Sequence, residues 1–428
     1  MYVKTLHSLT RHQRPPPPSD NPNTSCILRE VTCLRGISSY VPTGLYIYSE
    51  LSFMTLVRRS LLKGAAAACA LSGVPGFALA QTTSSSAARR FEPQAGQWRT
   101  FEVTTRVDLA DAKGAASRVW LPVPSINSDW QRSLESNFSS NGTSRMSSDG
   151  VEGARMLYTE FAAGVTPFVE VTSRVQTQSR FVDISKPSTH AFTREDAGTL
   201  HYYTRATKLL PTDGIVRTTA LKATQGAKTD AQKARAIYDW VVANAWREPK
   251  TRGCGEGDIK AMLETGNLGG KCADINALFV GLCRSVGVPA RDVYGIRLVP
   301  SAFGYKELSG NPASLKGAQH CRAEVYLQAH GWVAMDPADV AKVMRLETPE
   351  WIKRTDNAVV QPVYNRLFGG WEGNWMGWNT AHDVALPGSK EARLGFLIYP
   401  VAETVDGRAD SYAPDTFKYQ ITAREIKA

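Results

Sequence analysis

The chain has 428 residues, enough for two or three domains. Its 43% hydrophobic and 21% charged residues exclude a wholly disordered protein, and its seven cysteines are too few for a small disulfide-dense scaffold. The formal net charge of +10 divides between residues 1–80, with eight Lys/Arg and three Asp/Glu, and the remainder, with 42 and 37. Because the remainder is evenly mixed and has no long basic run, nucleic acid is not expected as a partner.

Residues 54–80 have the organisation of a secretory signal. The pair Arg58-Arg59 precedes an uncharged stretch over 64–80 that contains a proline, ends Ala-Leu-Ala and predicts cleavage before Gln81. The stretch is short for a membrane span. The paired arginines resemble a bacterial twin-arginine export signal, with an ordinary secretory signal as the alternative. We expect a periplasmic or secreted protein with no stable membrane insertion after cleavage.

Residues 1–53 precede this signal and show no sustained hydrophobic period, with four consecutive prolines within them. A signal of this kind belongs at the start of a chain. We therefore interpret 1–53 as a mis-annotated or disordered extension and expect translation to begin at Met54.

An N-terminal β domain is predicted over residues 96–185. Hydrophobic residues alternate with polar ones at Phe101, Val103 and Val107, and again further along at Val169 and Val171. Alternation of this kind, interrupted by Gly/Ser/Asn-rich breaks, is typical of half-buried antiparallel strands. We expect a sandwich-like arrangement that carries no catalytic motif.

The pattern changes to a helical period in residues 205–345, which we interpret as the catalytic domain of an α+β protein. Thr229 and Gln232 form a capping-box pattern at the start of a helix. Further elements are expected as helices at 258–264 and 272–286, and as strands at 291–299, 321–328 and 332–336.

Cys272 is the candidate nucleophile. It lies in the first turn of a predicted helix, where unpaired N–H groups and the helix dipole favour an anion, and a thiol there can have its pKa lowered from ~8.5 to ~3.5–7.5. The same amides could stabilise an oxyanion. Gly270, just before it, would let a substrate backbone approach. Cys283, in the middle of the helix, fits an ordinary buried cysteine better.

His320 is the candidate base and Asp336 its candidate orienting group. His320 opens a predicted strand, and alternation places it on the polar face, the expected wall of a cleft. A hairpin turn near His330 makes Asp336 roughly a diagonal neighbour of His320 within about one residue of register. Asp339 is the alternative orienting group, although Pro337 should end the ladder before it. A nucleophile, a base and an orienting carboxylate are the elements of a catalytic triad.

These segments together resemble the transglutaminase-like superfamily. The resemblance rests on residues 269–278 (GGKCADINAL), 284–291 (RSVGVPAR), 320–326 (HCRAEVY) and 331–337 (GWVAMDP). It implies a papain-like α+β core with catalytic Cys272, His320 and Asp336, acting on amides, and in bacterial forms usually without a metal. We therefore expect no cofactor. The family often has Ala-Trp after the histidine, where this chain has Cys321-Arg322.

Other cysteines and tryptophans give weaker signals. Cys254 and Cys321 could form a disulfide or remain separate thiols, and a zinc site including them lacks CxxC or HxxxH spacing. Residues 346–428 are expected to form an aromatic-rich loop and strands, at 394–400 and 416–422, packed on the core. In that loop Trp375 and Trp378 either receive substrate or pin a C-terminal hairpin.

The resulting hypothesis is a thiol-dependent enzyme that forms a thioester with a peptide or protein amide, cell-wall peptide being one candidate substrate. Resolution by water would make it a peptidase or amidase, and we favour this because water is abundant and no amine site is recognisable. Resolution by an amine would make it a protein-glutamine transamidase. The third alternative is a non-catalytic periplasmic module that binds peptide or glycan.

Overall fold

The computed structural model describes residues 89–109, 114–188, 192 and 194–427. The predicted extension over 1–53 and the export signal over 54–80 lie outside the described residues. Within the described part, none of the helices has the length and apolar character needed to cross a membrane.

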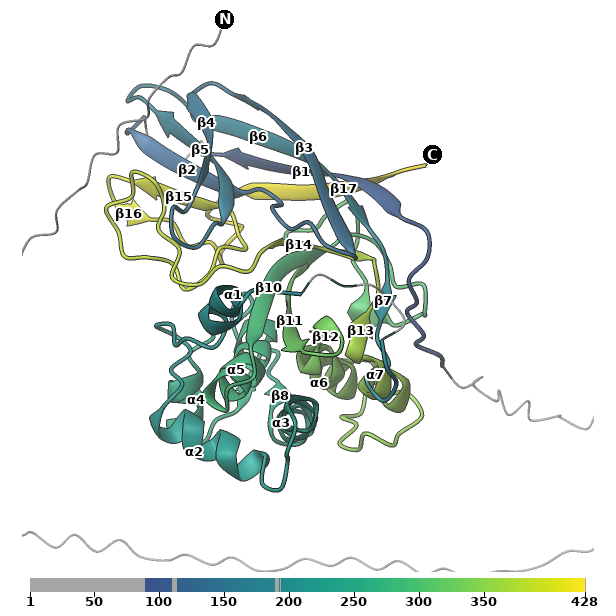
Figure 1. Cartoon of the computed structure of the whole chain (residues 1–428). Helices are drawn as coiled ribbons and strands as arrows, with labels where there is room; N and C mark the ends of the chain where they lie inside the picture. The colour runs from purple at the N-terminus through teal and green to yellow at the C-terminus, as the bar shows by residue number, and fades with distance from the viewer. Residues whose placement is uncertain (1–88, 110–113, 189–191, 193, 428) are drawn as a thin grey trace, which may run out of the picture. The chain divides into compact units, whose positions relative to one another are not determined.

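Two antiparallel sheets contain the predicted N-terminal strands (Figure 1). The first sheet has the order β17-β1-β6-β3, formed by β17 (Tyr419–Ile426), β1 (Arg99–Asp108), β6 (Phe168–Thr177) and β3 (Gln131–Ser140). The second has the order β16-β15-β2-β5-β4, formed by β16 (Gly407–Arg408), β15 (Val401–Thr404), β2 (Ser117–Pro122), β5 (Arg155–Phe161) and β4 (Thr143–Ser148). Burial alternates along β1, so the period of two in the sequence marks its buried face.

The predicted C-terminal strands form in part. The strand expected at 416–422 overlaps β17, which pairs with β1 in the register Val103↔Ala423, and β15 pairs with β2. Of the predicted strand at 394–400, only an isolated bridge between Leu394 and Val384 forms. Local periodicity reports which face of a strand is buried but not which distant strand it pairs with, so these pairings were not predicted.

A six-stranded antiparallel sheet forms the centre of the catalytic region, with the order β14-β10-β11-β12-β13-β7. Its strands are β14 (Trp375–Asn379), β10 (Ala290–Arg297), β11 (Gln319–Leu327), β12 (Gly331–Met335), β13 (Phe368–Trp371) and β7 (Arg180–Phe181). The aromatic segment expected to be a loop therefore supplies two strands. Glycine is needed there, since a Cβ on Gly370 would lie 2.4 Å from the carbonyl oxygen of Arg180.

The described residues contain seven α-helices: α1 (Ala197–Tyr202), α2 (Gly214–Ala223), α3 (Asp230–Asn244), α4 (Ile259–Thr265), α5 (Cys272–Ser285), α6 (Pro337–Leu346) and α7 (Gln361–Arg366). The capping box of Thr229 and Gln232 starts α3, as predicted. Helix α5 is buried along its whole length and packs against β10 and β11. This combination of helices with antiparallel sheets is the predicted α+β class.

The β11–β12 hairpin positions two of the predicted site residues. Its register pairs Ala323 with Met335, one residue from the expected pairing. Pro337 then begins α6, and Asp336 is the N-cap of that helix. The strand pairing ends before Pro337, as predicted, and a helix begins at this proline.

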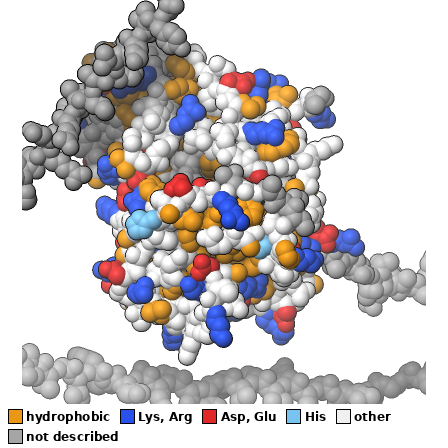
Figure 2. All heavy atoms as spheres, in the orientation of Figure 1, with side chains coloured by type: hydrophobic (Ala, Val, Ile, Leu, Met, Phe, Trp, Pro, Cys, Tyr) orange, Lys and Arg blue, Asp and Glu red, His pale blue; other side chains and the backbone are white. Residues whose placement is uncertain are grey.

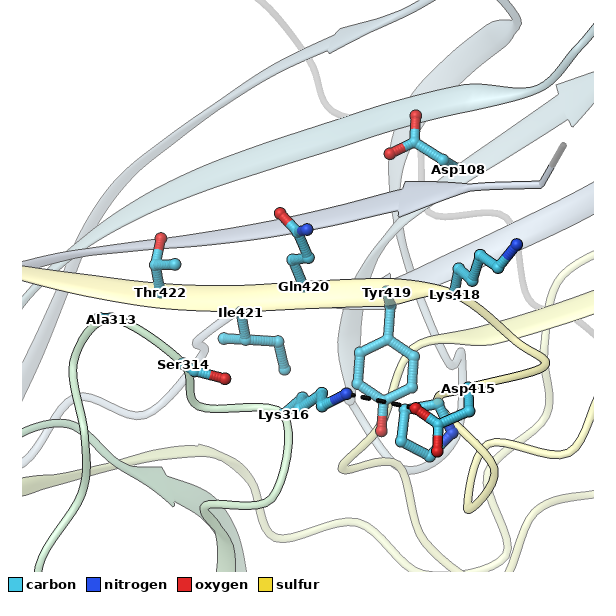
Figure 3. A pocket seen from close by; sticks show the side chains of 11 residues that line it. Asp108, Ala313, Ser314, Lys316, Asp415, Lys418, Tyr419, Gln420, Ile421 and Thr422 are labelled. Carbon is cyan, nitrogen blue, oxygen red and sulfur yellow. Dashed lines mark hydrogen bonds and ion pairs between the residues drawn. The ribbon is translucent and has the colours of Figure 1, made fainter.

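The surface visible in Figure 2 has interspersed basic and acidic side chains. A surface cavity of about 510 Å³ lies beside β17, where Lys316 forms an ion pair with Asp415 at 3.4 Å (Figure 3). The residues that line this cavity include Tyr419, Gln420 and Thr422 but no cysteine or histidine. The chemistry expected from the sequence is therefore located elsewhere.

Candidate active site

Cys272 is the first residue of α5, and a carboxylate of the same helix stabilises this end. Asp274 accepts a hydrogen bond from the amide of Lys271 at 2.8 Å. It also accepts the amides of Glu256 and Gly257, each at 2.9 Å, from the preceding loop. Asp274 thus satisfies donors at the helix start and attaches the loop that carries Cys254.

His320 lies between two buried carboxylates. Its Nε2 atom is 2.8 Å from Oδ2 of Asp336 and 3.3 Å from Oδ1 of Asp339. The hairpin supplies Asp336 and the first turn of α6 supplies Asp339, whose amide also donates to Oδ1 of Asp336. Both alternatives considered from the sequence therefore contact the imidazole, with Asp336 closer. Since Nε2 is occupied by carboxylates, Nδ1 is the nitrogen left for the thiol.

Asn276 connects helix α5, which begins at Cys272, to the carboxylate of Asp336. It lies one turn after Cys272 in α5, and its Nδ2 donates to Oδ1 of Asp336 at 3.2 Å and to the carbonyl of Cys321 at 2.8 Å. Its Oδ1 accepts the amide of Ala338 at 3.2 Å. The sequence analysis did not identify Asn276, although its position four residues after Cys272 places both on one side of the helix.

The surroundings of Cys272 stabilise its thiolate. Hydrogen bonds from the thiols of Cys254 and Cys321 lower the pKa of Cys272 well below its ordinary value, and the hydrogen bond and positive charge of His320 add to this, against the effect of burial. The neighbouring Cys272 raises the pKa of Cys254, and burial raises that of Cys321. The Cys254 thiol also donates to the carbonyl oxygen of Gln319 at 3.6 Å. These contacts favour the thiolate form of the buried Cys272 side chain.

The charge on His320 is balanced by its carboxylates. Burial and the charge of Arg297 disfavour the imidazolium, but Asp339 and Asp336 outweigh them and raise the pKa of His320 to about 9. Burial and the neighbouring Asp339 raise the pKa of Asp336. Although burial opposes it, the ion pair with Arg297 and the charge of His320 hold the pKa of Asp339 well below its usual range. Asp336 thus makes the shorter hydrogen bond, whereas Asp339 is the more firmly ionised.

The predicted substrate-binding role of the two tryptophans is not supported, because both side chains are buried, each 1% exposed. Trp375 donates from Nε1 to the carbonyl oxygen of His320 at 2.9 Å, so it holds the strand that carries His320. The guanidinium of Arg322 lies 4.6 Å from the Trp375 ring centroid and 5.2 Å from that of Trp371. The polar face of β11 is consequently covered by aromatic rings and does not form the open cleft wall that was expected.

Gly270 is also explained by packing. It pairs in the short parallel ladder of β8 (Trp246–Arg247) and β9 (Gly269–Gly270), and a Cβ added to it would lie 2.5 Å from the Cβ of Asp274. The glycine therefore makes room for the Asp274 side chain that attaches the loop.

Of the two alternatives for Cys254 and Cys321, a disulfide or separate thiols, the structure has separate thiols. Cys254, Cys272, Cys283 and Cys321 are all free and buried. The sulfur atoms of Cys254, Cys272 and Cys321 nevertheless lie within 4.8 Å of one another. A second group that could hold a cation, formed by His320, Asp336 and Asp339, is already joined by internal hydrogen bonds and paired with Arg297.

Comparisons with known proteins agree with this architecture. The family model of the transglutaminase-like superfamily matches residues 217–337. An uncharacterized protein of Haemophilus influenzae is 34% identical over 343 residues, covering 76% of this chain and 91% of the relative. An uncharacterized protein of Bacillus subtilis, YebA, is 30% identical over 129 residues, covering 28% of this chain and 17% of that protein.

Among solved structures, a protein described as a candidate cysteine protease of Cytophaga hutchinsonii has a TM-score of 0.46 at 15% identity, covering 78% of this chain and 92% of that one. The periplasmic domain of TgpA from Pseudomonas aeruginosa has a TM-score of 0.30 at 16% identity, covering 60% and 92%. The matched core and its near-full-length relative define the class: this chain belongs to the transglutaminase-like superfamily.

Proposed function

We propose that this protein is a thiol-dependent amide hydrolase in which Cys272 is the nucleophile, His320 the general acid–base and Asp336 the group that orients His320. The observation that supports the proposal is the joining of a stabilised thiolate, an imidazole hydrogen-bonded to it and a carboxylate 2.8 Å from the imidazole Nε2. A buried structural cysteine has no need of such partners.

The reaction begins when the Cys272 thiolate attacks the carbonyl carbon of a peptide or protein amide. His320, as imidazolium, donates its proton to the departing amine, leaving a thioester on Cys272. Water then attacks the thioester, His320 accepts its proton, and the acid product leaves as the thiolate is restored. Asp336 and Asp339 stabilise the imidazolium throughout this cycle and hold the ring with Nδ1 toward the sulfur.

Fewer backbone amides at the start of α5 are free to stabilise an oxyanion than the sequence suggested. The amide of Ala273 donates to the carbonyl of Cys254 at 2.9 Å, which removes this donor from the reacting oxygen. The amide of Cys272 itself is the donor closest to the nucleophilic sulfur along the chain, and it remains our candidate.

The site is nearly closed to solvent, which favours a specific extended substrate over indiscriminate hydrolysis. Cys272 is 3% exposed and His320 is 4% exposed. A substrate must therefore present its amide through a narrow approach, as a flexible peptide segment can and a compact folded surface cannot. Peptides, with cell-wall peptide among the candidates, are the proposed substrate class.

Export is a separate part of the proposal and rests on the sequence alone. The Arg58-Arg59 pair and the uncharged stretch that follows it support twin-arginine export to the periplasm and cleavage before Gln81. Mass measurement of the mature protein, expressed in a bacterium with and without a functional twin-arginine pathway, tests it. Export that persists without the pathway would contradict it.

The enzymatic proposal is tested by thiol labelling followed by turnover. Iodoacetamide at about pH 6 should modify Cys272 selectively in the native protein, identified by peptide mapping. A peptide library incubated with the protein should yield hydrolysed products that Cys272→Ala does not produce. Added primary amines distinguish the transamidase, since incorporation of the amine in place of hydrolysis would contradict the hydrolase. Slow, non-selective alkylation with no turnover would support the binding module instead.

A further inference from the structure

The three sulfur atoms around the nucleophile form a cluster that the proposed reaction does not require. Cys254 comes from the loop before α4, Cys272 from the start of α5 and Cys321 from β11. Their sulfurs lie within 4.8 Å of one another, and the residues are 2%, 3% and 0% exposed. An ordinary thiol nucleophile needs a base beside it but not two further thiols.

We propose that Cys254, Cys272 and Cys321 form a three-coordinate binding site for a soft monovalent cation, copper(I), in which each sulfur supplies one ligand. A metal about 2.3 Å from each of three sulfurs holds them about 4 Å apart, so only a small contraction of the present cluster is required. Thiolates are the ligands that select copper(I) over hard cations. This inference does not depend on the proposed hydrolase activity.

The proton balance of binding follows from the form in which cysteine binds a metal. Copper(I) forms three metal–sulfur bonds with thiolates, so each S–H bond present before binding breaks and its proton leaves to solvent. No electron is transferred.

The surroundings favour three ligands over four. His320 presents Nδ1 toward Cys272, but it is not part of the group whose ligand atoms all lie within 4.8 Å of one another around the three sulfurs. Its Nε2 is hydrogen-bonded to Asp336 and close to Asp339. A tetrahedral zinc site would need a fourth ligand that the sulfur cluster lacks. A further contact supports the cluster from outside, since the Tyr399 hydroxyl donates to the sulfur of Cys254 at 3.1 Å and so orients this ligand.

Anaerobic titration of the reduced mature protein with copper(I), in competition with a chromogenic copper(I) chelator, tests the site. We expect one copper(I) to be retained per chain, with near-ultraviolet sulfur-to-copper absorption and an X-ray absorption spectrum that fits three sulfur neighbours and no nitrogen. Cys254→Ser and Cys321→Ser should each weaken retention by about 100-fold or more, because even changes outside the ligand set cost about 10–100-fold. Cys283→Ser, which alters a buried cysteine outside the cluster, is the matched control and should retain copper as the wild type does.

A measurement on the unaltered protein guards against variants that fail to fold. Loading with copper(I) should protect Cys272 from iodoacetamide, and removal of the metal by excess chelator should restore labelling. A coordination sphere containing nitrogen, or tighter retention of zinc than of copper(I), would overturn the proposal. So would variants Cys254→Ser and Cys321→Ser that retain copper(I) as tightly as the wild type does. If the site binds copper(I) but no peptide is hydrolysed, only the hydrolase proposal fails.

Discussion

The two ends of helix α5 carry cysteines with opposite properties. Cys272 and Cys283 are three helical turns apart, so they project from the same side of the helix, and both are buried. The pKa of Cys283 is raised well above the ordinary value by burial. The pKa of Cys272 is lowered well below it, chiefly by the thiols of Cys254 and Cys321. The helix face therefore does not decide the reactivity of a cysteine, whereas the donors that meet its sulfur do.

The comparison also separates two roles of the helix terminus. The first turn of α5 leaves backbone donors that favour a negative charge, which was the reason for choosing Cys272 from the sequence. The structure adds a more direct cause, because sulfur-bound protons and an imidazole reach the Cys272 thiolate from other segments. Substitutions at the two ends should therefore have effects of different kinds.

The largest contrast is expected from removing each thiol in turn. Cys272→Ala should lower kcat for peptide hydrolysis by about 10⁴-fold or more, since loss of a nucleophile removes the covalent pathway. Cys283→Ala should leave kcat within about twofold, because no reacting group contacts it. Steady-state hydrolysis, with circular dichroism to establish folding, measures both. Comparable activity of the Cys272→Ala protein would refute the mechanism.

The next effect concerns the two carboxylates at His320. Asp336→Asn should lower kcat by about 10³–10⁴-fold, because an amide stabilises the imidazolium less and favours the wrong tautomer. Asp339→Asn should cost less, because its hydrogen bond to His320 is longer. Single-turnover rates compare the two variants.

A second buried histidine–aspartate pair provides the control for these substitutions. His382 Nε2 lies 3.3 Å from Asp292 Oδ2, and neither residue belongs to the group of three cysteines or to the group of His320, Asp336 and Asp339. Asp292→Asn should leave kcat unchanged. If Asp339→Asn lowered kcat more than Asp336→Asn does, the roles that we assign to the two carboxylates would have to be exchanged.

The pH dependence should sharpen the contrast further. Because the pKa of Cys272 is lowered, its alkylation rate should stay high at neutral pH and decline only as pH falls through that depressed pKa. The pKa of His320 is raised to about 9, so hydrolysis that requires the imidazolium should decline as pH rises through about 9. Native Cys283 should stay unlabelled over the same range. A rate that increased with pH up to ~8.5, as for a free thiol, would contradict the assignment.

The same raised pKa predicts how His320 affects folding. A group with a higher pKa in the folded chain stabilises it fully below its unfolded value of ~6.5, and this contribution is lost as pH rises through about 9. Urea unfolding at pH 6 and pH 9.5 should therefore show a loss of stability that is smaller in His320→Ala. An equal loss in the two proteins would argue against this linkage.

The smallest expected effect is on the free energy of unfolding, from substitution of Cys283 near the C-terminal end of α5. Cys283→Ser should reduce the free energy of unfolding by about 1–2 kcal/mol, because it places a hydroxyl in apolar surroundings. Cys272→Ser should cost less, since its hydroxyl meets polar partners. Urea denaturation at one pH compares the two losses in the free energy of unfolding. A larger loss for Cys272→Ser would show that the polar surroundings of Cys272 do not stabilise an uncharged hydroxyl group.

Several features of the site followed from local patterns in the sequence. A pair of glycines before an apolar helical stripe identified the helix start at Cys272, and the alternation and turn around His330 placed His320 and Asp336 within one residue of the observed register. Each of these patterns spans fewer than about twenty residues, so it can be recognised from the hydrophobic periodicity of one segment.

Other features depend on contacts between residues that are far apart in the sequence. The contribution of Arg297 was missed, because its ion pair with Asp339 joins residues from separate strands and helices. The pairing of β17 with β1 was missed because it joins the two ends of the described chain. The role of Trp375 stayed open between receiving substrate and pinning a C-terminal hairpin, because an aromatic, glycine-rich run has the same composition whether it lines a pocket or fills a core.

The sequence by itself determined the class of protein, the helix and hairpin of its site, and three residues whose chemistry belongs together. Only the tertiary structure decided which groups surround the sulfur of Cys272, because Cys254, Cys272 and Cys321 meet through contacts between a loop, a helix and a strand. The physical reason is that periodicity records how each segment buries its own apolar side, whereas the charge of a buried atom depends on neighbours that long-range packing brings to it.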